Sequence, residues 1–484
     1  MPMTALLELR KPLDDLEMTV VRRHLGRPDE TQAPLLDNLR YALSFARLTT
    51  VRNGQGEDIE VADFLAAHRW KIKSVLEPAL RGREPTLRAA YRQLPNLIRE
   101  TREWRARLLS RFALDRESID AEVTQRQLVV ACGGGGGSGY GYAGAYQLLH
   151  RSGLQPELVC GTSMGAIIST FRARHRVFDA AKPLAAARRL TWQTVFRVLE
   201  VESRYGIPAS LRLYLRTALG SLFEMEGGRQ ATFHDMEVPL LIVVTGVTLD
   251  GLRHDLGYYE HYLDEAVRPG VVFRSSWLKR FAGLVGLWKE FIQRPDTLRE
   301  VVFGADDLTM DFDVLDAAGF SSAVTGVIHY DVLRDDPRTR HLLDQLYGIH
   351  GISRLTEGGL VNNVPARPAW WEVMKGRLGR RNPFVLALDC FTPSRGGLAW
   401  VPLQQVVRPN VRANKPFANL YFPLKQRLSP VNLVPPASEV QKAMGWTSDE
   451  LAPHVPFMQE MLRPLRPLPD GGEHEAYGLC LQSR

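Results

Sequence analysis

The sequence contains few cysteines and no long apolar run, and both shortages limit what the protein can be. Among its 484 residues are only four cysteines, Cys132, Cys160, Cys390 and Cys480. Four scattered cysteines are too few for a disulfide framework, so we expect a reducing compartment, the cytoplasm. The N-terminus has no apolar segment of signal-peptide length, and no run of 18 apolar residues occurs. We therefore expect no signal peptide, no transmembrane segment and, if the protein meets a membrane, peripheral contact.

The sequence also lacks the patterns that bind metals and read nucleic-acid bases. No group of cysteines and histidines has zinc-ligand spacing, and no base-reading motif is present. The formal net charge of +7 is mild. Without a base-reading motif, this charge fits an anionic lipid surface better than a nucleic acid. We expect no metal, no cofactor and no nucleic-acid partner, and the sequence leaves the oligomeric state open.

Hydrophobic patterning divides the chain into three regions. Residues 1–124 predict an N-terminal helical region. In residues 125–395 short apolar runs alternate with helical segments, which predicts an α/β domain with a mainly parallel sheet. Residues 396–484 are rich in proline and predict an irregular C-terminal extension with short helices near 439–444 and 457–462. The predicted strands of the α/β domain are 128–132, 158–160, 240–244 and 384–388.

Two segments have the spacing of amphipathic helices. The segment from Leu94 to Leu108 interleaves apolar residues with arginines, which predicts a helix with a solvated arginine face. A face for anionic membranes is the alternative. The segment from Trp277 to Ile292 combines two tryptophans with basic residues. This composition suits a lipid interface or a lid, and a core-facing helix fits equally well.

A serine between two glycines is the clearest chemical motif of the chain. Ser163 lies in the sequence Gly-Thr-Ser-Met-Gly, flanked by Gly161 and Gly165. This is the pattern of a nucleophile elbow, in which the serine rides a sharp turn from a strand to a helix and the glycines avoid a Cβ clash. Upstream, the run of glycines 133–137 offers backbone N–H groups that can bind an oxyanion. Together the two motifs indicate acyl transfer.

Three interpretations of the glycine-rich region compete. The segment from Gly139 to Gly144 matches the dinucleotide fingerprint G-x-G-x-x-G, but the next strand ends in Cys160 rather than in an acidic residue. A P-loop requires Gly-Lys-Ser/Thr after the glycines, and this triplet is absent. The third interpretation, an oxyanion hole that serves Ser163, agrees with the motif downstream and is the one we favour.

The segment from Leu128 to Ala166 resembles the patatin-like phospholipases. The glycine triplet of that family aligns with residues 134–136, its helix glycine with Gly144, and its elbow with residues 161–166. A second block, residues 357–365, resembles the family's acid-Gly-Gly block and the Asn-x-Pro stretch that follows it. The resemblance extends over roughly residues 126–395. It implies a three-layer α/β/α fold with a mainly parallel central sheet, to which this chain adds its helical N-terminal region and its C-terminal extension.

The resemblance also implies a dyad of serine and acid that works without a histidine. By that resemblance Ser163 is the nucleophile, Glu357 the general base, and the backbone amides of Gly135, Gly136 and Gly137 the oxyanion hole. The implied activity is that of a serine lipid acyl hydrolase of the phospholipase A or lysophospholipase type. Its substrate would be a phospholipid or another acyl lipid, met at a membrane surface.

Two positions depart from the family pattern. Ser138 stands where the family usually has arginine or lysine, and Glu357 stands where it has aspartate. A glutamate places its carboxylate one methylene further out, and a displacement of about 1 Å can cost about 10²-fold in rate. A catalytically impaired pseudoenzyme that binds lipid or acts as a scaffold is therefore the second hypothesis. A third, the α/β-hydrolase triad, needs a histidine after the acid, and only His454 and His474 follow Glu357.

Overall fold

The computed structural model describes most of the chain, namely residues 1–81, 86–198, 204–207, 209–248, 295–332, 336–392 and 401–469. The amphipathic segment from Trp277 to Ile292 lies outside these residues, as do His474 and Cys480. The chain divides into two compact units. The first unit comprises residues 1–127, 371–384 and 456–484, and the second comprises residues 128–370 and 385–455. The three regions inferred from the sequence stay a prediction about domains.

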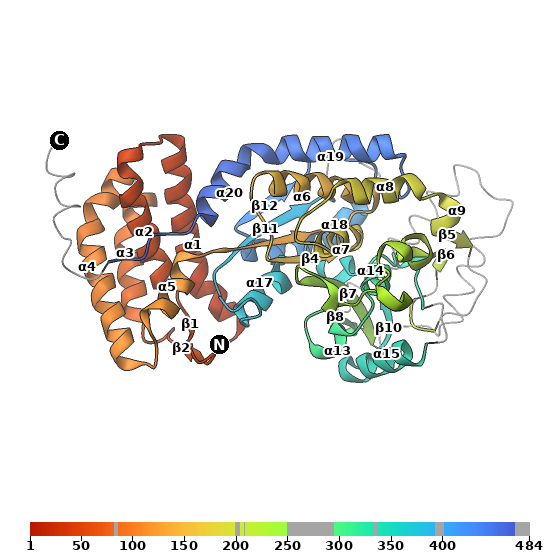
Figure 1. Cartoon of the computed structure of the whole chain (residues 1–484), viewed down its shortest axis with the longest axis horizontal. Helices are drawn as coiled ribbons and strands as arrows, with labels where there is room; N and C mark the ends of the chain where they lie inside the picture. The colour runs from red at the N-terminus through yellow and green to blue at the C-terminus, as the bar shows by residue number, and fades with distance from the viewer. Residues whose placement is uncertain are drawn as a thin grey trace. The chain divides into compact units, whose positions relative to one another are not determined.

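Helices dominate the first unit, and Figure 1 shows α1 to α4 side by side. In α4 the apolar residues Leu94, Leu97 and Leu108 are buried, so this stripe faces the core of the unit. Arg105 breaks the expected solvated arginine face, because it is buried and donates a hydrogen bond to the carbonyl of Leu468 (2.7 Å). The elements before the first strand of the second unit are α1 (Met3–Gly26), α2 (Ala33–Ala46), β1 (Thr50–Arg52), β2 (Asp58–Glu60), α3 (Ala66–Arg81), α4 (Leu87–Arg111) and α5 (Arg116–Thr124).

A buried cluster of ion pairs joins the helices of the first unit. Glu17 accepts hydrogen bonds from Arg40 (3.1 Å), Arg47 (2.7 Å) and Arg126 (2.7 Å), and Asp14 accepts two more from Arg47 and Arg126. Burial opposes the ionisation of Glu17, but the attraction of Arg126, Arg47 and Arg40 outweighs it and lowers the pKa of this carboxyl. Removing one partner would leave an uncompensated buried charge, so the cluster fixes how these helices pack.

The central sheet of the second unit is mainly parallel, as the sequence predicts. Its strand order is β10-β7-β4-β3-β11-β12, and β8 also pairs with β7. The pairs β3–β4, β4–β7 and β11–β12 are parallel, whereas β8 and β10 run antiparallel to β7. The four strands predicted from apolar runs are β3, β4, β7 and β11. The strands are β3 (Gln127–Cys132), β4 (Leu158–Thr162), β7 (Leu240–Thr248), β8 (Leu298–Phe303), β10 (Ile352–Thr356), β11 (Pro383–Asp389) and β12 (Leu420–Pro423).

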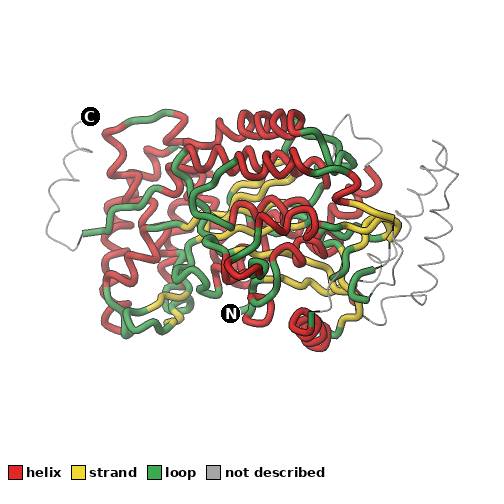
Figure 2. Tube along the Cα trace, turned by 45° about the vertical axis from the view of Figure 1, so that its right-hand side comes forward, coloured by secondary structure: helices red, strands yellow, loops and turns green. Residues whose placement is uncertain are grey.

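Helices cover both faces of this sheet and complete a three-layer α/β/α fold (Figure 2). Helices α6 and α19 pack so closely that only glycine fits at position 144. A Cβ there would lie 2.0 Å from the carbonyl oxygen of Met444. Ser448 of α19 donates a hydrogen bond to the Gly144 carbonyl (2.8 Å). The helical segments that the sequence predicts between the apolar runs include α6 and α7. The helices are α6 (Tyr142–Arg151), α7 (Met164–Ala173), α13 (Asp307–Met310), α14 (Val314–Ser321), α15 (Pro337–His350), α16 (Gly359–Asn362), α17 (Ala366–Met374), α18 (Val401–Asn414) and α19 (Ala437–Leu451).

The proline-rich C-terminal region contains more regular structure than the sequence indicates. The predicted short helices are the longer α19 and α20 (Val455–Leu462), and α18 and β12 are additional. Two of the prolines there sit where a proline costs little: Pro423 is the last residue of β12, and Pro436 is the N-cap of α19. Pro409 lies inside α18. In this region, prolines therefore occur at the ends of helices and strands as well as in loops.

A smaller sheet and three short helices follow α7 and form one side of the second unit. The sheet has the order β5-β6-β9, with β5–β6 antiparallel and β6–β9 parallel. This subdomain is placed beside the end of β4, where the candidate serine lies, and it supplies walls of a pocket described below. Its elements are α8 (Ala181–Arg189), α9 (Trp192–Val195), β5 (Phe196–Val198), β6 (Ala209–Leu213), α10 (Leu215–Leu219) and β9 (Gly326–His329).

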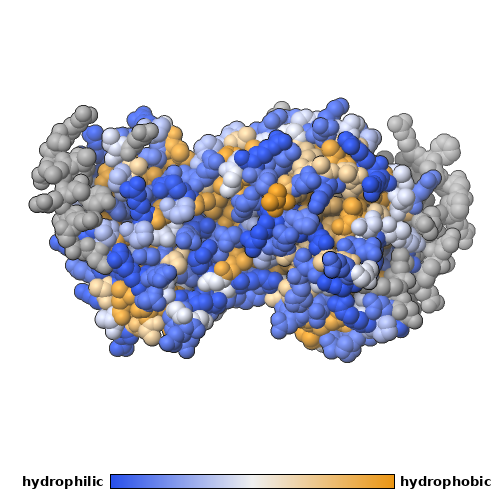
Figure 3. Space-filling view, viewed as in Figure 1, coloured by the Kyte–Doolittle hydropathy of each residue, from blue (hydrophilic) through white to orange (hydrophobic). Residues whose placement is uncertain are grey.

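On one face of the molecule the apolar residues form small patches. Figure 3 shows hydrophilic residues over most of the face in view, with hydrophobic residues scattered among them. Scattered apolar residues of this kind are normal on a folded protein. Of the helices in the described part of the chain, none has both the length and the hydropathy that crossing a bilayer requires.

Candidate active site

Ser163 occupies a strained turn between a strand and a helix. It follows β4 and precedes α7, with φ 54° and ψ −126°, and it is the one non-glycine residue with positive φ among the described residues. Such a conformation costs of order 1–3 kcal/mol and persists when the surroundings hold it. A side chain at Gly161 would lie 2.5 Å from the Cα of Ala166, and one at Gly165 would lie 2.2 Å from the carbonyl of Cys132. The turn therefore requires both glycines.

Side chains from distant parts of the chain hold this turn. The backbone N–H of Ser163 donates to Ser321 Oγ (2.8 Å), and Ser321 in turn donates to the carbonyl of Val243 in β7 (2.6 Å). Thr162 donates from its hydroxyl to the carbonyl of Asn362 (2.9 Å). The end of α14 and the block after β10 thus fix the position from which the Ser163 hydroxyl projects.

Glu357 lies next to Ser163, directly after β10. Its N–H donates to the carbonyl of Ala323 (3.0 Å), and its carbonyl accepts from the Thr245 hydroxyl (2.6 Å), so its backbone is fixed. The side chain is 7% exposed, and its Oε2 has no hydrogen-bond partner among the described residues. Burial raises the pKa of Glu357 to about 8, and interaction with the Ser163 hydroxyl acts in the opposite direction. Near neutral pH the carboxyl is therefore mostly protonated.

Replacing Glu357 by glutamine should stabilise the protein at high pH. The pKa of about 8 in the folded chain exceeds the value of 4.5 for a free glutamate, so between these values the folded state holds a proton that the unfolded state has lost. The free energy of unfolding of the parent therefore falls as pH rises through this window, by about 1.4 kcal/mol per pH unit. Glutamine does not ionise and is free of this loss.

The measurement is the melting temperature of the parent and of Glu357→Gln at pH 5 and at pH 9. We expect similar melting temperatures at pH 5. At pH 9 we expect the variant to melt at a higher temperature than the parent, because its free energy of unfolding is greater by an amount on the order of 4 kcal/mol. A difference between the two proteins that is the same at both pH values would contradict the burial of an ionisable carboxyl at this position.

Two backbone N–H groups of the glycine loop make no hydrogen bond among the described residues. Those of Gly135 and Gly136 have no acceptor in the described part of the chain, and Gly136 lines the same pocket as Ser163. The N–H of Gly137 donates to the carbonyl of Pro430 (2.9 Å). The family resemblance predicts the Gly137 amide as a third donor of the oxyanion hole, but in the structure the Pro430 carbonyl already accepts its hydrogen bond. Backbone N–H donors of this kind, not engaged by the protein, can bind an oxyanion.

Contacts from two other segments hold the glycine loop in place. The buried Ser138 donates from its hydroxyl to the carbonyl of Leu428 (2.7 Å), so the residue that departs from the family pattern anchors the loop. Upstream, the N–H of Gly134 donates to the carbonyl of Asn363 (2.9 Å). The Asn-x-Pro stretch predicted from the sequence therefore contacts the loop through its backbone.

Asp389, the last residue of β11, and His454 make contacts of their own. Asp389 accepts hydrogen bonds from the Tyr421 hydroxyl and from the N–H of Phe391 (2.8 Å), which occupy both of its carboxyl oxygens. Burial raises the pKa of Asp389. The ring of His454 packs edge-on against Phe422, with the ring centroids 5.4 Å apart. These contacts of Asp389 and His454 lead to Phe391, Tyr421 and Phe422.

The elbow, the glycine loop and Glu357 all fall within one family match. The model of the family described as Patatin-like phospholipase matches residues 130–370. The chain carries a patatin-like phospholipase domain. This match runs from β3 to α17, and it implies lipid acyl hydrolase activity. A search of curated proteins found none that matches this chain.

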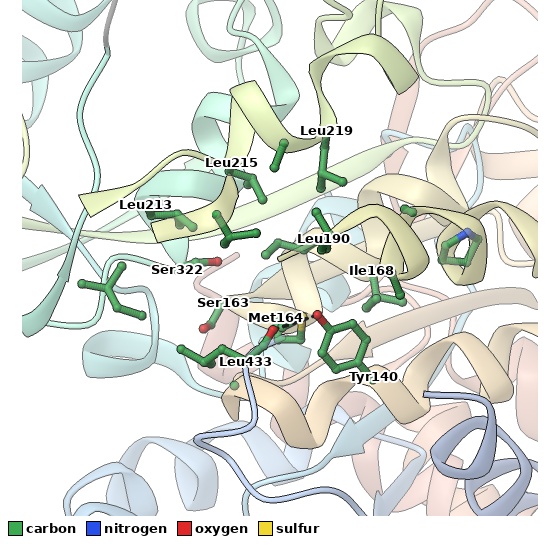
Figure 4. Close-up of a pocket in the computed structure, with 18 of the residues that line it drawn as sticks. Tyr140, Ser163, Met164, Ile168, Leu190, Leu213, Leu215, Leu219, Ser322 and Leu433 are labelled. Carbon is green, nitrogen blue, oxygen red and sulfur yellow. Dashed lines mark hydrogen bonds between the residues drawn. The ribbon is translucent and has the colours of Figure 1, made fainter. Parts of the chain in front are cut away.

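An apolar pocket of the patatin-like domain opens at Ser163 (Figure 4). It holds about 770 Å³ of empty space, part of which is open to solvent. Its polar side chains are Tyr140, Ser163 and Ser322. An apolar cavity that leads to a serine suits the hydrocarbon chain of an acyl group. The apolar walls include Ile168, Leu190, Leu213, Leu215, Leu219 and Leu433.

Several residues of the site lack any local signal in the sequence. Ser321, which holds the elbow of the patatin-like domain, and Ser322, which lines its pocket, end a short helix with no recognisable motif. Leu433 reaches the pocket from the proline-rich region. Each is defined by neighbours far away in the chain, such as Ser163 for Ser321, and the periodicity and motif spacing of a sequence do not reveal such neighbours. In the described ranges, no three histidine, cysteine, aspartate or glutamate side chains are grouped to hold a metal ion.

Proposed function

We propose that this chain is a serine lipid acyl hydrolase of the phospholipase A or lysophospholipase type. In this proposal Ser163 is the nucleophile, Glu357 the general base, and the N–H groups of Gly135 and Gly136 the oxyanion hole. The observation that carries it is the placement of Ser163, whose strained turn meets a buried carboxyl on one side and an apolar pocket on the other. The substrate is a phospholipid or another acyl lipid presented at a membrane surface, and the protein acts in the cytoplasm.

In the first half of the reaction the acyl group moves to the enzyme. The ionised carboxylate of Glu357 accepts the hydroxyl proton of Ser163 as Oγ forms a bond to the ester carbonyl carbon. The carbonyl electrons move to its oxygen, which the amides of Gly135 and Gly136 stabilise. The tetrahedral intermediate then collapses, the bond to the alcohol oxygen breaks, and Glu357 returns its proton to that oxygen. The products are a free alcohol and an acyl ester on Ser163.

In the second half water clears the acyl group. Glu357 accepts a proton from water while the water oxygen bonds to the acyl carbon, and the same two amides receive the new oxyanion. Collapse breaks the bond to Ser163 Oγ, which takes back the proton from Glu357. The fatty acid leaves, and both residues return to their starting states. No cofactor enters this scheme.

Activity should rise steeply with pH. Glu357 acts as a base only when it is ionised, and with a pKa of about 8 about one molecule in ten is ionised at pH 7. We expect kcat/KM on an uncharged ester to increase about tenfold per pH unit below pH 8 and to level off above it. The measurement is a pH profile from pH 6 to 9.5 with a soluble ester.

Asp389→Asn is the matched control for this profile, because it removes the other buried carboxyl at a strand end. We expect the control to keep the inflection near pH 8. An inflection near pH 4 to 5 in the parent, or a flat profile, would show that the catalytic base is another group.

A specific observation also favours the second candidate, a lipid-binding pseudoenzyme. Glu357 is buried, mostly neutral at pH 7, and unpaired at Oε2, so its power to activate Ser163 at neutral pH is low. Labelling with a fluorophosphonate probe at pH 7 and pH 9 separates the candidates, because only an activated serine reacts quickly. The hydrolase should label faster at pH 9, with Ser163→Ala unlabelled. A parent that stays unlabelled at both values would favour the pseudoenzyme.

A further inference from the structure

One polar group in the apolar pocket has no role in the scheme above. Of the three polar side chains that line the pocket, Ser163 is the proposed nucleophile and Tyr140 donates its hydroxyl to the carbonyl of Leu433 (2.9 Å). The third is Ser322, which is 7% exposed. Its hydroxyl has no hydrogen-bond partner among the described residues. Figure 4 shows this oxygen directed into the space between the apolar side chains.

The position of Ser322 is fixed close to the elbow. It directly follows Ser321, whose hydroxyl is 2.8 Å from the backbone nitrogen of Ser163, and neighbouring Cα atoms are about 3.8 Å apart. The N–H of Ser322 also donates to the carbonyls of Ala318 (3.0 Å) and Gly319 (3.1 Å) at the end of α14. The hydroxyl is therefore held at the end of the pocket where the scissile ester must sit, rather than at its far end.

An unpaired hydroxyl in an apolar pocket discriminates between ligands. A plain hydrocarbon chain leaves the hydroxyl buried without a partner, which is unfavourable. A ligand oxygen within reach accepts a hydrogen bond from this hydroxyl. That bond replaces the hydrogen bond to water that the hydroxyl loses when the ligand fills the pocket. Sites built around a hydrogen-bonding group reject analogues that lack the matching atom far more strongly than apolar sites distinguish chain lengths.

We propose that Ser322 binds an oxygen substituent on the ester-proximal carbons of the acyl chain, so that the pocket prefers hydroxyacyl esters to unsubstituted ones. This proposal rests on the proposed function, because it assigns the pocket to the acyl group that Ser163 receives. A hydroxyl substituent accepts the hydrogen bond of Ser322 and donates its own in return. The remaining chain meets the apolar walls. The specificity of the enzyme is thus set by one side chain outside the Ser163–Glu357 pair.

The test compares two matched esters on three proteins. The esters are 4-nitrophenyl decanoate and 4-nitrophenyl 3-hydroxydecanoate, the latter as each enantiomer. The proteins are the parent, Ser322→Ala, and the control Ser353→Ala, which removes a serine of the same unit that donates to the Val247 carbonyl outside the pocket. The measured quantity is the ratio of kcat/KM for the hydroxy ester to that for the plain ester. Intrinsic reactivity of the esters cancels when this ratio is compared between proteins.

We expect the ratio of one enantiomer to fall about tenfold in Ser322→Ala, and the control to keep the ratio of the parent. The plain ester should gain in kcat/KM in Ser322→Ala, because the variant pocket buries no unpaired hydroxyl. Equal ratios in parent and variant would overturn the proposal. An equal loss of kcat/KM for both esters in Ser322→Ala would also overturn it, since that result would place Ser322 at the ester group or the leaving group, which the two esters share.

A binding measurement separates this proposal from the proposed function. Titration calorimetry with decanoic acid and 3-hydroxydecanoic acid gives the same comparison without turnover. If the parent hydrolyses neither ester but binds the hydroxy acid about tenfold more tightly, and Ser322→Ala loses this preference, the hydrolase assignment fails and the role of Ser322 stands. If the parent binds both acids equally, the role of Ser322 is refuted whether or not esters are hydrolysed.

Discussion

Replacing Ser163 by alanine is expected to reduce ester hydrolysis by about 10⁶-fold. Loss of a serine nucleophile removes the acyl-enzyme route altogether, and effects of this size follow in serine hydrolases that rely on one. The hydroxyl of Ser163 projects from a turn held by the backbone contacts to Ser321, and alanine keeps those contacts. The fold and the pocket should therefore survive the change. The measurement is kcat/KM on a short-chain ester at pH 9, where Glu357 is ionised.

The control for this loss is the melting temperature of the variant, which we expect to match that of the parent within about 2 °C, because no core group is removed. Binding of a fatty acid in the pocket should also persist. Retention of more than about a tenth of the parent activity would exclude Ser163 as the nucleophile.

Removing the carboxyl of Glu357 is expected to give the second largest loss, about 10³-fold or more, because a serine hydroxyl is a weak nucleophile until a base takes its proton. Glu357→Gln is the sharper variant, since it keeps the size of the side chain and should lose as much activity as Glu357→Ala. Glu357→Asp keeps a carboxylate and should retain more activity than either. The three variants are compared on one ester at pH 9.

Asp389→Asn again serves as the matched control. Both oxygens of Asp389 are engaged by Tyr421 and Phe391, so this side chain has no free group to act on Ser163. We expect it to lose far less activity, per folded molecule, than Glu357→Gln. The opposite order would move the role of base from Glu357 to Asp389.

The raised pKa of Glu357 connects the stability, the pH profile and the probe reactivity of this protein. All three depend on the same protonation step near pH 8. Glutamine at this position should stabilise the chain at pH 9 while removing activity. Such a trade between stability and function is common where a site keeps an ionisable group buried.

Local patterns in the sequence determined much of the fold. The strands β3, β4, β7 and β11 are continuous apolar runs because both faces of the sheet are covered, and such runs are visible without a structure. The strands β8 and β10 were missed, since polar residues that are at least partly exposed interrupt their apolar runs, Arg299 and Glu300 in β8 and Ser353 and Arg354 in β10. The strand β12 was missed because its four residues lie among prolines.

For the site, the sequence by itself determined the elements whose chemistry depends on neighbours in the chain. The elbow at Ser163 and the glycine run are local because a sharp turn and exposed amides need particular residues side by side. Tertiary structure decided everything that depends on distant partners. The carbonyl of Pro430 engages the amide of Gly137, burial makes Glu357 mostly neutral, and the end of α14 brings the unpaired hydroxyl of Ser322 into the pocket. Hydrogen bonding and desolvation are set by what surrounds a group in space, and residues far apart in the chain supply those surroundings.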